Sequence, residues 1–133
     1  MDAPILASFV IPRRPLSKKN HRPIFRDART GRSFLGKSPE LRAYEAHCIS
    51  HLSLTWRRRE ALTCRLWVEC HAYFENRVGE PDLLGWQETL WDCLEAAGVI
   101  ANDKQVESSD GSRKHLRRGV EPSATIVIRE FIE

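Results

Sequence analysis

The sequence predicts an α+β domain in which a small mixed β-sheet of about four strands packs with two main helices. Three observations predict this class. Short apolar runs rich in β-formers lie near both ends, one central segment alternates strictly, and two segments repeat apolar residues at helical spacing. The chain has 133 residues, which suits one domain around a single core, so we expect residues 1–133 to form one unit.

The N-terminal part combines a strand with a long basic segment. Ile5–Ile11 is apolar and is followed by a proline, which predicts a strand. Residues 12–37 form a basic ribbon or loop in which Ile24–Arg26 and Ser33–Leu35 flank a Thr30-Gly31 turn. A basic segment of this length inside a compact domain is more often functional than structural.

The first helix has a clear start. Ser38-Pro39-Glu40 supplies a capping hydroxyl, a proline at the first helical position and an acid in the first turn, and the helix should run to about Trp56. The apolar stripe comprises Leu41, Tyr44, Cys48 and Leu52. His47 and His51 are spaced to share a transition metal, but without further paired ligands nearby a partly exposed helix face explains them better.

The centre of the chain predicts a strand, a helix and a second strand. Leu62 to Phe74 alternates apolar and polar residues, as in a half-buried strand. Asp82 then caps the second helix, which Gly98 ends, and a strand follows near Lys104 to Ser108. The inward face of this helix should comprise Leu83, Leu90, Leu94 and Ala97.

A polar basic loop at residues 110–118 and a strand from Ala124 to Ile132 complete the predicted order. The four cysteines form no Cys-x-x-Cys pair, so we expect reduced, mostly buried thiols. The start of the chain lacks the features of a signal peptide, and no apolar run reaches about 18 residues, so we expect a cytoplasmic protein that does not enter a membrane.

Charge is divided unevenly along the chain. Residues 1–37 hold nine Lys and Arg against two Asp, whereas residues 75–103 hold seven Asp and Glu against one Arg. Basic arms around an acidic centre suit a polyanionic ligand with metal-dependent chemistry in the middle, and an unevenly charged solvated surface is the alternative.

The stretch from Pro81 to Val106 places an acid at each end of the predicted helix. Asp82 opens it, and Asp103 lies in the turn before the next strand. We expect this arrangement to fold the two carboxylates toward one point. Converging carboxylates either bind a hard divalent cation or cap helix ends, and Asp103 also suits a simple turn.

The same stretch resembles the RusA family of Holliday junction resolvases, phage-associated endonucleases that cut four-way DNA junctions. The residues that match the family pattern are Pro81-Asp82, Asp92-Cys93-Leu94, Ala97-Gly98 and Asn102-Asp103-Lys104-Gln105-Val106. Ser17-Lys18-Lys19-Asn20 is also similar to the family's N-terminal Ser-x-Asn segment. The resemblance implies a RusA-like fold, a homodimer and an active site with Mg²⁺ or Mn²⁺ held by three aspartates, which a lysine assists.

Two of the family's aspartates carry over, to Asp82 and Asp103. Leu84 stands where the resemblance calls for the second aspartate, Gly85 replaces an asparagine, and Glu88 replaces the lysine. Leucine cannot ligate a metal. We therefore expect Glu88 to act as a third ligand, which gives Asp82, Asp103 and Glu88 as the catalytic and metal-binding set.

Two further acids, Glu80 and Asp92, have expected roles that differ from each other. Glu80 is a second candidate ligand, because it keeps the acid-x-acid spacing with Asp82 in a shifted register. Asp92 lies inside the predicted helix, where a structural hydrogen bond explains it better than a metal.

Ten basic residues are predicted to contact DNA phosphates, which supply affinity without reading sequence. They are Lys18, Lys19, Arg22, Arg26, Arg29, Arg32, Arg113, Lys114, Arg117 and Arg118. Phe25, Phe34 and Trp86 could wedge into a junction centre, although ribbon aromatics more often cluster locally.

Three functions follow as expectations. The first is a Mg²⁺-dependent endonuclease that resolves four-way junctions as a homodimer. The second is a weakly active or inactive relative that binds branched DNA without cutting it. The third is an unrelated small α/β interaction domain whose basic loops bind protein or RNA.

Overall fold

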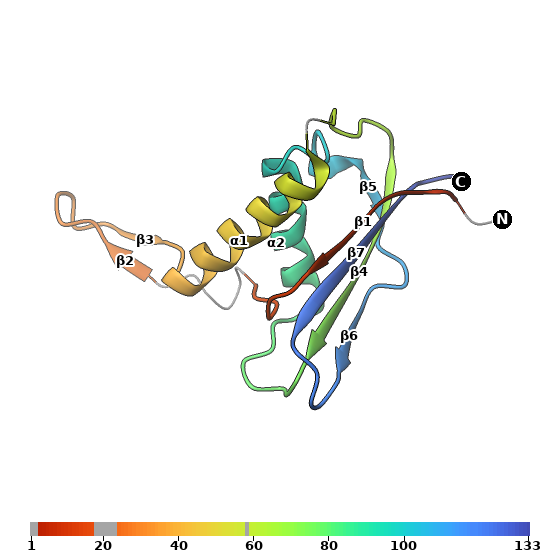
Figure 1. Cartoon of the computed structure of the whole chain (residues 1–133). Helices are drawn as coiled ribbons and strands as arrows, with labels where there is room; N and C mark the ends of the chain where they lie inside the picture. The colour runs from red at the N-terminus through yellow and green to blue at the C-terminus, as the bar shows by residue number, and fades with distance from the viewer. Residues whose placement is uncertain (1–2, 18–23, 58) are drawn as a thin grey trace.

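The computed structural model describes residues 3–17, 24–57 and 59–133, and Figure 1 shows the whole chain. Its strands are β1 (Ile5–Ile11), β2 (Ile24–Arg26), β3 (Ser33–Leu35), β4 (Leu66–Phe74), β5 (Val106–Ser108), β6 (Arg113–Leu116) and β7 (Ser123–Glu130). Its α-helices are α1 (Pro39–Trp56) and α2 (Leu83–Ala96), and a short 3₁₀ helix covers Asp103–Gln105.

Five strands form one mixed sheet. β7 lies antiparallel between β1 and β4, while β5 and β6 both run parallel to β4. β5 pairs with the start of β4, and β6 with its end. The sheet and its two helices confirm the predicted α+β class, with one strand more than expected.

The core lies between the sheet and the two helices, which cover one of its faces (Figure 1). Along β4, every second residue from Leu66 to Phe74 is buried, and the residues between are half-buried. The alternation therefore predicted the two faces of this strand correctly.

Both helix starts follow the predicted chemistry. Ser38 Oγ accepts a hydrogen bond from Leu41 N at 3.1 Å, and Asp82 Oδ2 accepts one from Gly85 N at 3.0 Å. Gly98 has φ of +77°, the left-handed conformation expected just beyond the end of α2. The predicted stripe of α1 is buried throughout, which confirms the helical spacing.

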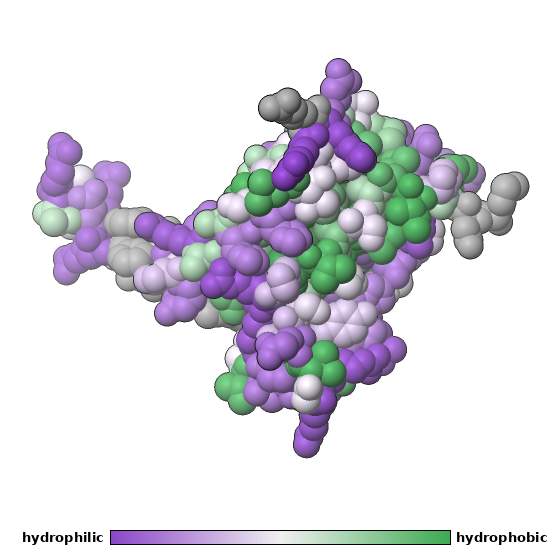
Figure 2. All heavy atoms as spheres, in the orientation of Figure 1, coloured by the Kyte–Doolittle hydropathy of each residue, from purple (hydrophilic) through white to green (hydrophobic). Residues whose placement is uncertain are grey.

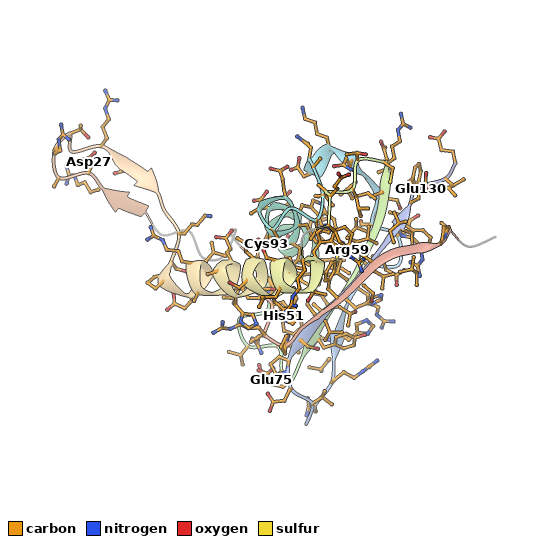
Figure 3. All side chains as sticks on the ribbon, turned by 45° about the horizontal axis from the view of Figure 1, so that its top comes forward. Asp27, His51, Arg59, Glu75, Cys93 and Glu130 are labelled. Atoms are coloured by element: carbon orange, nitrogen blue, oxygen red, sulfur yellow. The ribbon has the colours of Figure 1, made fainter. Side chains whose placement is uncertain are left out.

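A small hairpin formed by β2 and β3 projects from the body beyond the start of α1 (Figure 1). Figure 2 shows mainly hydrophilic residues on it, whereas hydrophobic residues gather on the body. In Figure 3, Asp27 at its turn lies far from the labelled residues of the body. The predicted ribbon is thus confirmed at the predicted residues.

Three predicted boundaries were wrong. The predicted loop at 110–118 contains β6, because residues 113–116 find a parallel partner in β4 that no local sequence signal reveals. The strand predicted from Leu62 begins at Leu66, since Leu62 instead forms an isolated bridge with Ile100. The strand near Lys104 begins at Val106, because a capping box between Asn102 and Gln105 holds a helical turn there.

All four cysteines are free thiols, as expected. Among the described residues, no helix is long and apolar enough to cross a membrane.

Candidate functional site

Asp82 sits at the N-terminal end of α2 and is half-buried. Its carboxylate caps the helix through Gly85 N. Gly85 lies close to two polar side chains, since an added Cβ would lie 2.5 Å from Ser17 Oγ and 2.8 Å from Asp82 Oδ1. A larger residue at position 85 would therefore require Ser17 or Asp82 to move.

Asp103 lies in the turn after the C-terminal end of the same helix. Its backbone N–H donates to Glu95 Oε1 at 3.0 Å, and its side chain is exposed. Gln105 ties this turn to the sheet, because its Nε2 donates to the carbonyl oxygens of Leu62 and Cys64 at 2.8 Å each. The turn is thus fixed near the far end of α2 from Asp82.

The two acids expected to converge, Asp82 and Asp103, lie at opposite ends of α2 in one chain. This helix has 14 residues and is about 20 Å long. Glu88 lies between them on an exposed part of the helix. Among the residues that the structure describes, no three His, Cys, Asp or Glu side chains are grouped to hold a metal ion.

The alternative ligand Glu80 is engaged with cations. Arg77 Nη1 donates to Glu80 Oε1 at 3.2 Å, and Lys114 Nζ lies 3.7 Å from its other carboxylate oxygen. Lys114 Nζ also donates to the carbonyl oxygen of Pro81 at 3.3 Å. Lys114 therefore fastens β6 to the start of α2 and is less suited to a phosphate than predicted.

Asp92 is half-buried and lines a groove between α1 and α2 with Lys37 and Arg42. The structural hydrogen bond expected for Asp92 stays a prediction.

The other predicted DNA contacts fall into two exposed groups. Arg26, Arg29 and Arg32 are exposed on the β2–β3 hairpin. Arg26 Nε donates to the carbonyl oxygen of Gly31 at 3.2 Å, which steadies the turn. The second group, exposed at β6 and just after it, comprises Arg113, Arg117 and Arg118. The remaining predicted contacts, Lys18, Lys19 and Arg22, lie outside the described residues.

The three aromatic residues suggested to wedge into a junction centre lie in different places. Trp86 is fully buried, and its Nε1 donates to Tyr44 Oη at 3.1 Å, so it is a core residue and not a wedge. Phe25 and Phe34 face each other across the hairpin in backbone register, and their side chains lie outside what the structure describes.

A pocket between α2 and β5 was missed by the sequence analysis. Its cavity has a volume of about 270 Å³. The lining residues are Leu84, Gln87, Glu88 and Trp91 from α2, and Val106, Glu107, Ser108 and Ser109 from β5 and the residue after it. The spacing of the helical residues puts them on one helix face, but only the folded sheet brings β5 opposite them.

A row of polar side chains on the sheet was also missed. His71 Nε2 lies 2.6 Å from Glu69 Oε2, and His71 Nδ1 lies 2.8 Å from His115 Nε2. Arg129 Nη1 donates to Glu69 Oε1 at 3.2 Å, and the ring of Tyr73 stacks on His115 with centroids 4.7 Å apart. The alternation along β4 indicated part of this row, but His115 joins it only through β6.

The row shifts the protonation of its members. Hydrogen bonding to His71, with a further contribution from Arg129, lowers the pKa of the Glu69 carboxyl against the opposing effect of burial. Burial lowers the pKa of His115, as do the nearby His71, Arg113 and Arg117. Near neutral pH, the row therefore holds a charged Glu69 and a neutral His115.

His47 and His51 stack on α1 with ring centroids 6.3 Å apart. Burial, Arg13 and His51 together lower the pKa of His47. Both are half-buried, which fits the predicted helix face.

Neither a scan against protein-family models nor a search of curated proteins found a match to this chain.

Proposed function

We propose that this chain binds branched DNA in the manner that its resemblance to RusA resolvases implies. The observation that carries the proposal is the projecting hairpin with three exposed arginines, Arg26, Arg29 and Arg32. Guanidinium groups on a protruding element can reach phosphates that a flat surface cannot. Because phosphate contacts carry no sequence information, such binding suits recognition of DNA shape.

The second exposed group supports the same proposal. Arg113 lies on β6, and Arg117 and Arg118 directly follow this strand. Figure 1 shows β6 in the main sheet, apart from the projecting hairpin. Two separate basic regions suit two arms of a junction better than one continuous duplex. In a homodimer a two-fold axis would double both regions, which would match the four arms of a junction.

A second candidate is the Mg²⁺-dependent junction endonuclease. The observation that favours it is the match of both Asp82 and Asp103 to the family pattern, with part of each accessible to solvent. One chain does not bring these carboxylates together, and Leu84 offers no ligating atom. This candidate therefore needs the homodimer, and we derive no metal-dependent step from the residues of one chain.

A labelled four-way junction tests both candidates. The protein is mixed with the junction, with a linear duplex of the same sequence, and with either Mg²⁺ or EDTA. A gel shift selective for the junction, without cleavage, supports the binding function alone. Cleavage that EDTA abolishes supports the endonuclease. Equal shifts of junction and duplex, or no shift, would exclude branched-DNA recognition.

A further inference from the structure

Gln87 places an unsatisfied amide at the pocket between α2 and β5. Gln87 is 4% exposed, and its Nε2 is buried without a hydrogen-bond partner. Native proteins retain few buried polar groups without a partner, because such a group loses its hydrogen bonds to water and gains none in return. Gln87 also lines the pocket, so its unpaired amide lies beside the space that a ligand would occupy.

The rest of the pocket pairs apolar walls with acidic ones. Trp91 is half-buried and Leu84 is 70% exposed, so both offer apolar surface to an occupant. Glu88 and Glu107 contribute carboxylates from opposite sides. At about 270 Å³ the cavity is smaller than the roughly 300–1,000 Å³ of pockets that hold drug-sized ligands, so its occupant should be a small group.

We propose that this pocket receives one unpaired nucleobase that carries an exocyclic amino group. An aromatic wall such as Trp91 can stack on any base, because every base has a π-face. A carboxylate accepts a hydrogen bond from an exocyclic amine, and a glutamine amide can donate to the ring nitrogen or carbonyl beside that amine. Glu88 or Glu107 and Gln87 supply these two groups. The inference rests on the proposed DNA-binding function and names the part of the DNA that this face recognises.

The charge of the pocket decides which part of DNA enters. A site for phosphate would present cations, whereas Glu88 and Glu107 would repel a phosphate. Arg65 Nε lies 3.6 Å from Glu107 Oε1 at an exposed position. Glu88, by contrast, forms no ion pair with any residue that the structure describes. A neutral base can enter, while the basic hairpin holds the backbone elsewhere.

The positions that depart from the RusA pattern help to form this pocket. Leu84 and Glu88 stand where the resemblance calls for an aspartate and a lysine, and both line the cavity. Aspartate at 84 would replace the apolar wall with a third charge, and lysine at 88 would remove an acceptor. The same departures that weaken a metal site therefore favour a base.

Four-way junctions with a single unpaired dC or dT at the crossover test the inference. Thymine lacks the amino group, so the dC junction should bind roughly 10-fold more tightly. Gln87→Leu and Glu88→Ala should each remove most of this preference. Glu60→Ala, which removes an exposed carboxylate outside the pocket, should keep it. Glu107→Gln provides a second surface variant if Gln87→Leu fails to fold.

Free nucleosides separate this inference from the proposed function. In ¹H–¹⁵N spectra, deoxycytidine should shift the side-chain signals of Gln87 and Trp91, and thymidine should not. Junction binding with equal affinity for dC and dT, and no such shifts, would overturn the pocket and leave the DNA-binding function standing. Shifts without junction binding would support the pocket and overturn that function. Shifts produced by Mg²⁺ or by free arginine, but not by deoxycytidine, would assign the pocket to a cation and overturn the inference.

Discussion

The β2–β3 hairpin is basic and projects from the body, whereas helix α2 is acidic and packs against the core. The hairpin joins two strands of three residues each, carries exposed arginines and projects from the body. α2 carries only acidic charges and is anchored by Trp86, Leu90 and Leu94, all fully buried. Substitutions on the hairpin should therefore change binding alone, whereas changes on α2 test binding and folding together.

The buried and exposed faces of α2 also differ in how far their residues can change. The buried face of α2 is fixed by packing, but its exposed face can exchange residues at small cost in stability. Leu84 and Glu88 both lie on that exposed face. The helix can thus keep its place in the fold while the chemistry of its outer side changes.

The largest expected effect comes from the anchor of α2. Trp86→Ala should lower the free energy of unfolding by about 3–5 kcal/mol, because it leaves a cavity and removes the hydrogen bond to Tyr44. Urea denaturation measures this change. Replacing Arg29 on the hairpin with Gln serves as the control and should change stability by less than about 0.5 kcal/mol. Comparable decreases in the two variants would mean that the hairpin supports the fold as much as α2 does.

The sequence predicted best those features whose causes are local. Ser38 and Pro39 fix the start of α1 by their own chemistry, and the alternation along β4 separates its two faces. β6 was missed because only its pairing with β4 makes residues 113–116 a strand. In the same way, Gln87 and Trp91 could be placed on one helix face, but the β5 side of their pocket depends on tertiary packing.

The positions of Asp82 and Asp103 show why the order of residues along the chain does not by itself predict which side chains meet. The length of α2 was already predictable from the cap at Asp82 and the stop at Gly98, and a helix of that length is about 20 Å long. The expectation of convergence came from the order of the acids and took no account of this length.

The hairpin should have the second largest effect, and on DNA alone. Replacing Arg26, Arg29 and Arg32 with glutamine should weaken junction binding and flatten its dependence on salt. The slope of log affinity against log salt should fall by about 0.9 for each phosphate that the variant no longer neutralises. Titrations at several salt concentrations measure it. Asp27→Asn, which removes a negative charge from the same turn, should strengthen binding slightly, and an unchanged slope in the triple variant would remove the hairpin from the interface.

Substitutions at Asp82 should have a smaller effect on stability, and they separate its capping role from a role in Mg²⁺-dependent cleavage. Asp82→Ala should cost about 1 kcal/mol of stability, because the first turn of α2 loses its cap. Asp82→Asn should cost little, since asparagine caps equally well. If the endonuclease candidate holds, both variants should lose Mg²⁺-dependent cleavage of the junction. Wild-type cleavage by the Asn variant would limit Asp82 to a capping role.

The smallest expected effect is the pH dependence that His115 gives to the sheet face. Because the folded chain lowers the pKa of His115 below its usual 6.5, the unfolded chain takes up a proton first as the pH falls. Stability should therefore decline as the pH falls below about 6.5 and toward the folded pKa, where a positive charge on His115 forms close to Arg113 and Arg117. The charged Glu69 contributes in the same direction at lower pH, since its own pKa is depressed and its contribution is lost as it protonates.

Melting temperatures recorded between pH 8 and pH 5.5 measure this effect. His115→Gln should flatten the decline, because glutamine keeps a hydrogen-bonding group next to His71 but does not titrate. The control variant, His51→Gln, removes an imidazole on α1, outside this row. Its melting temperature should decline with falling pH more steeply than that of His115→Gln. Equal pH profiles for wild type and His115→Gln would mean that the titration of His115 does not contribute to the pH dependence of stability.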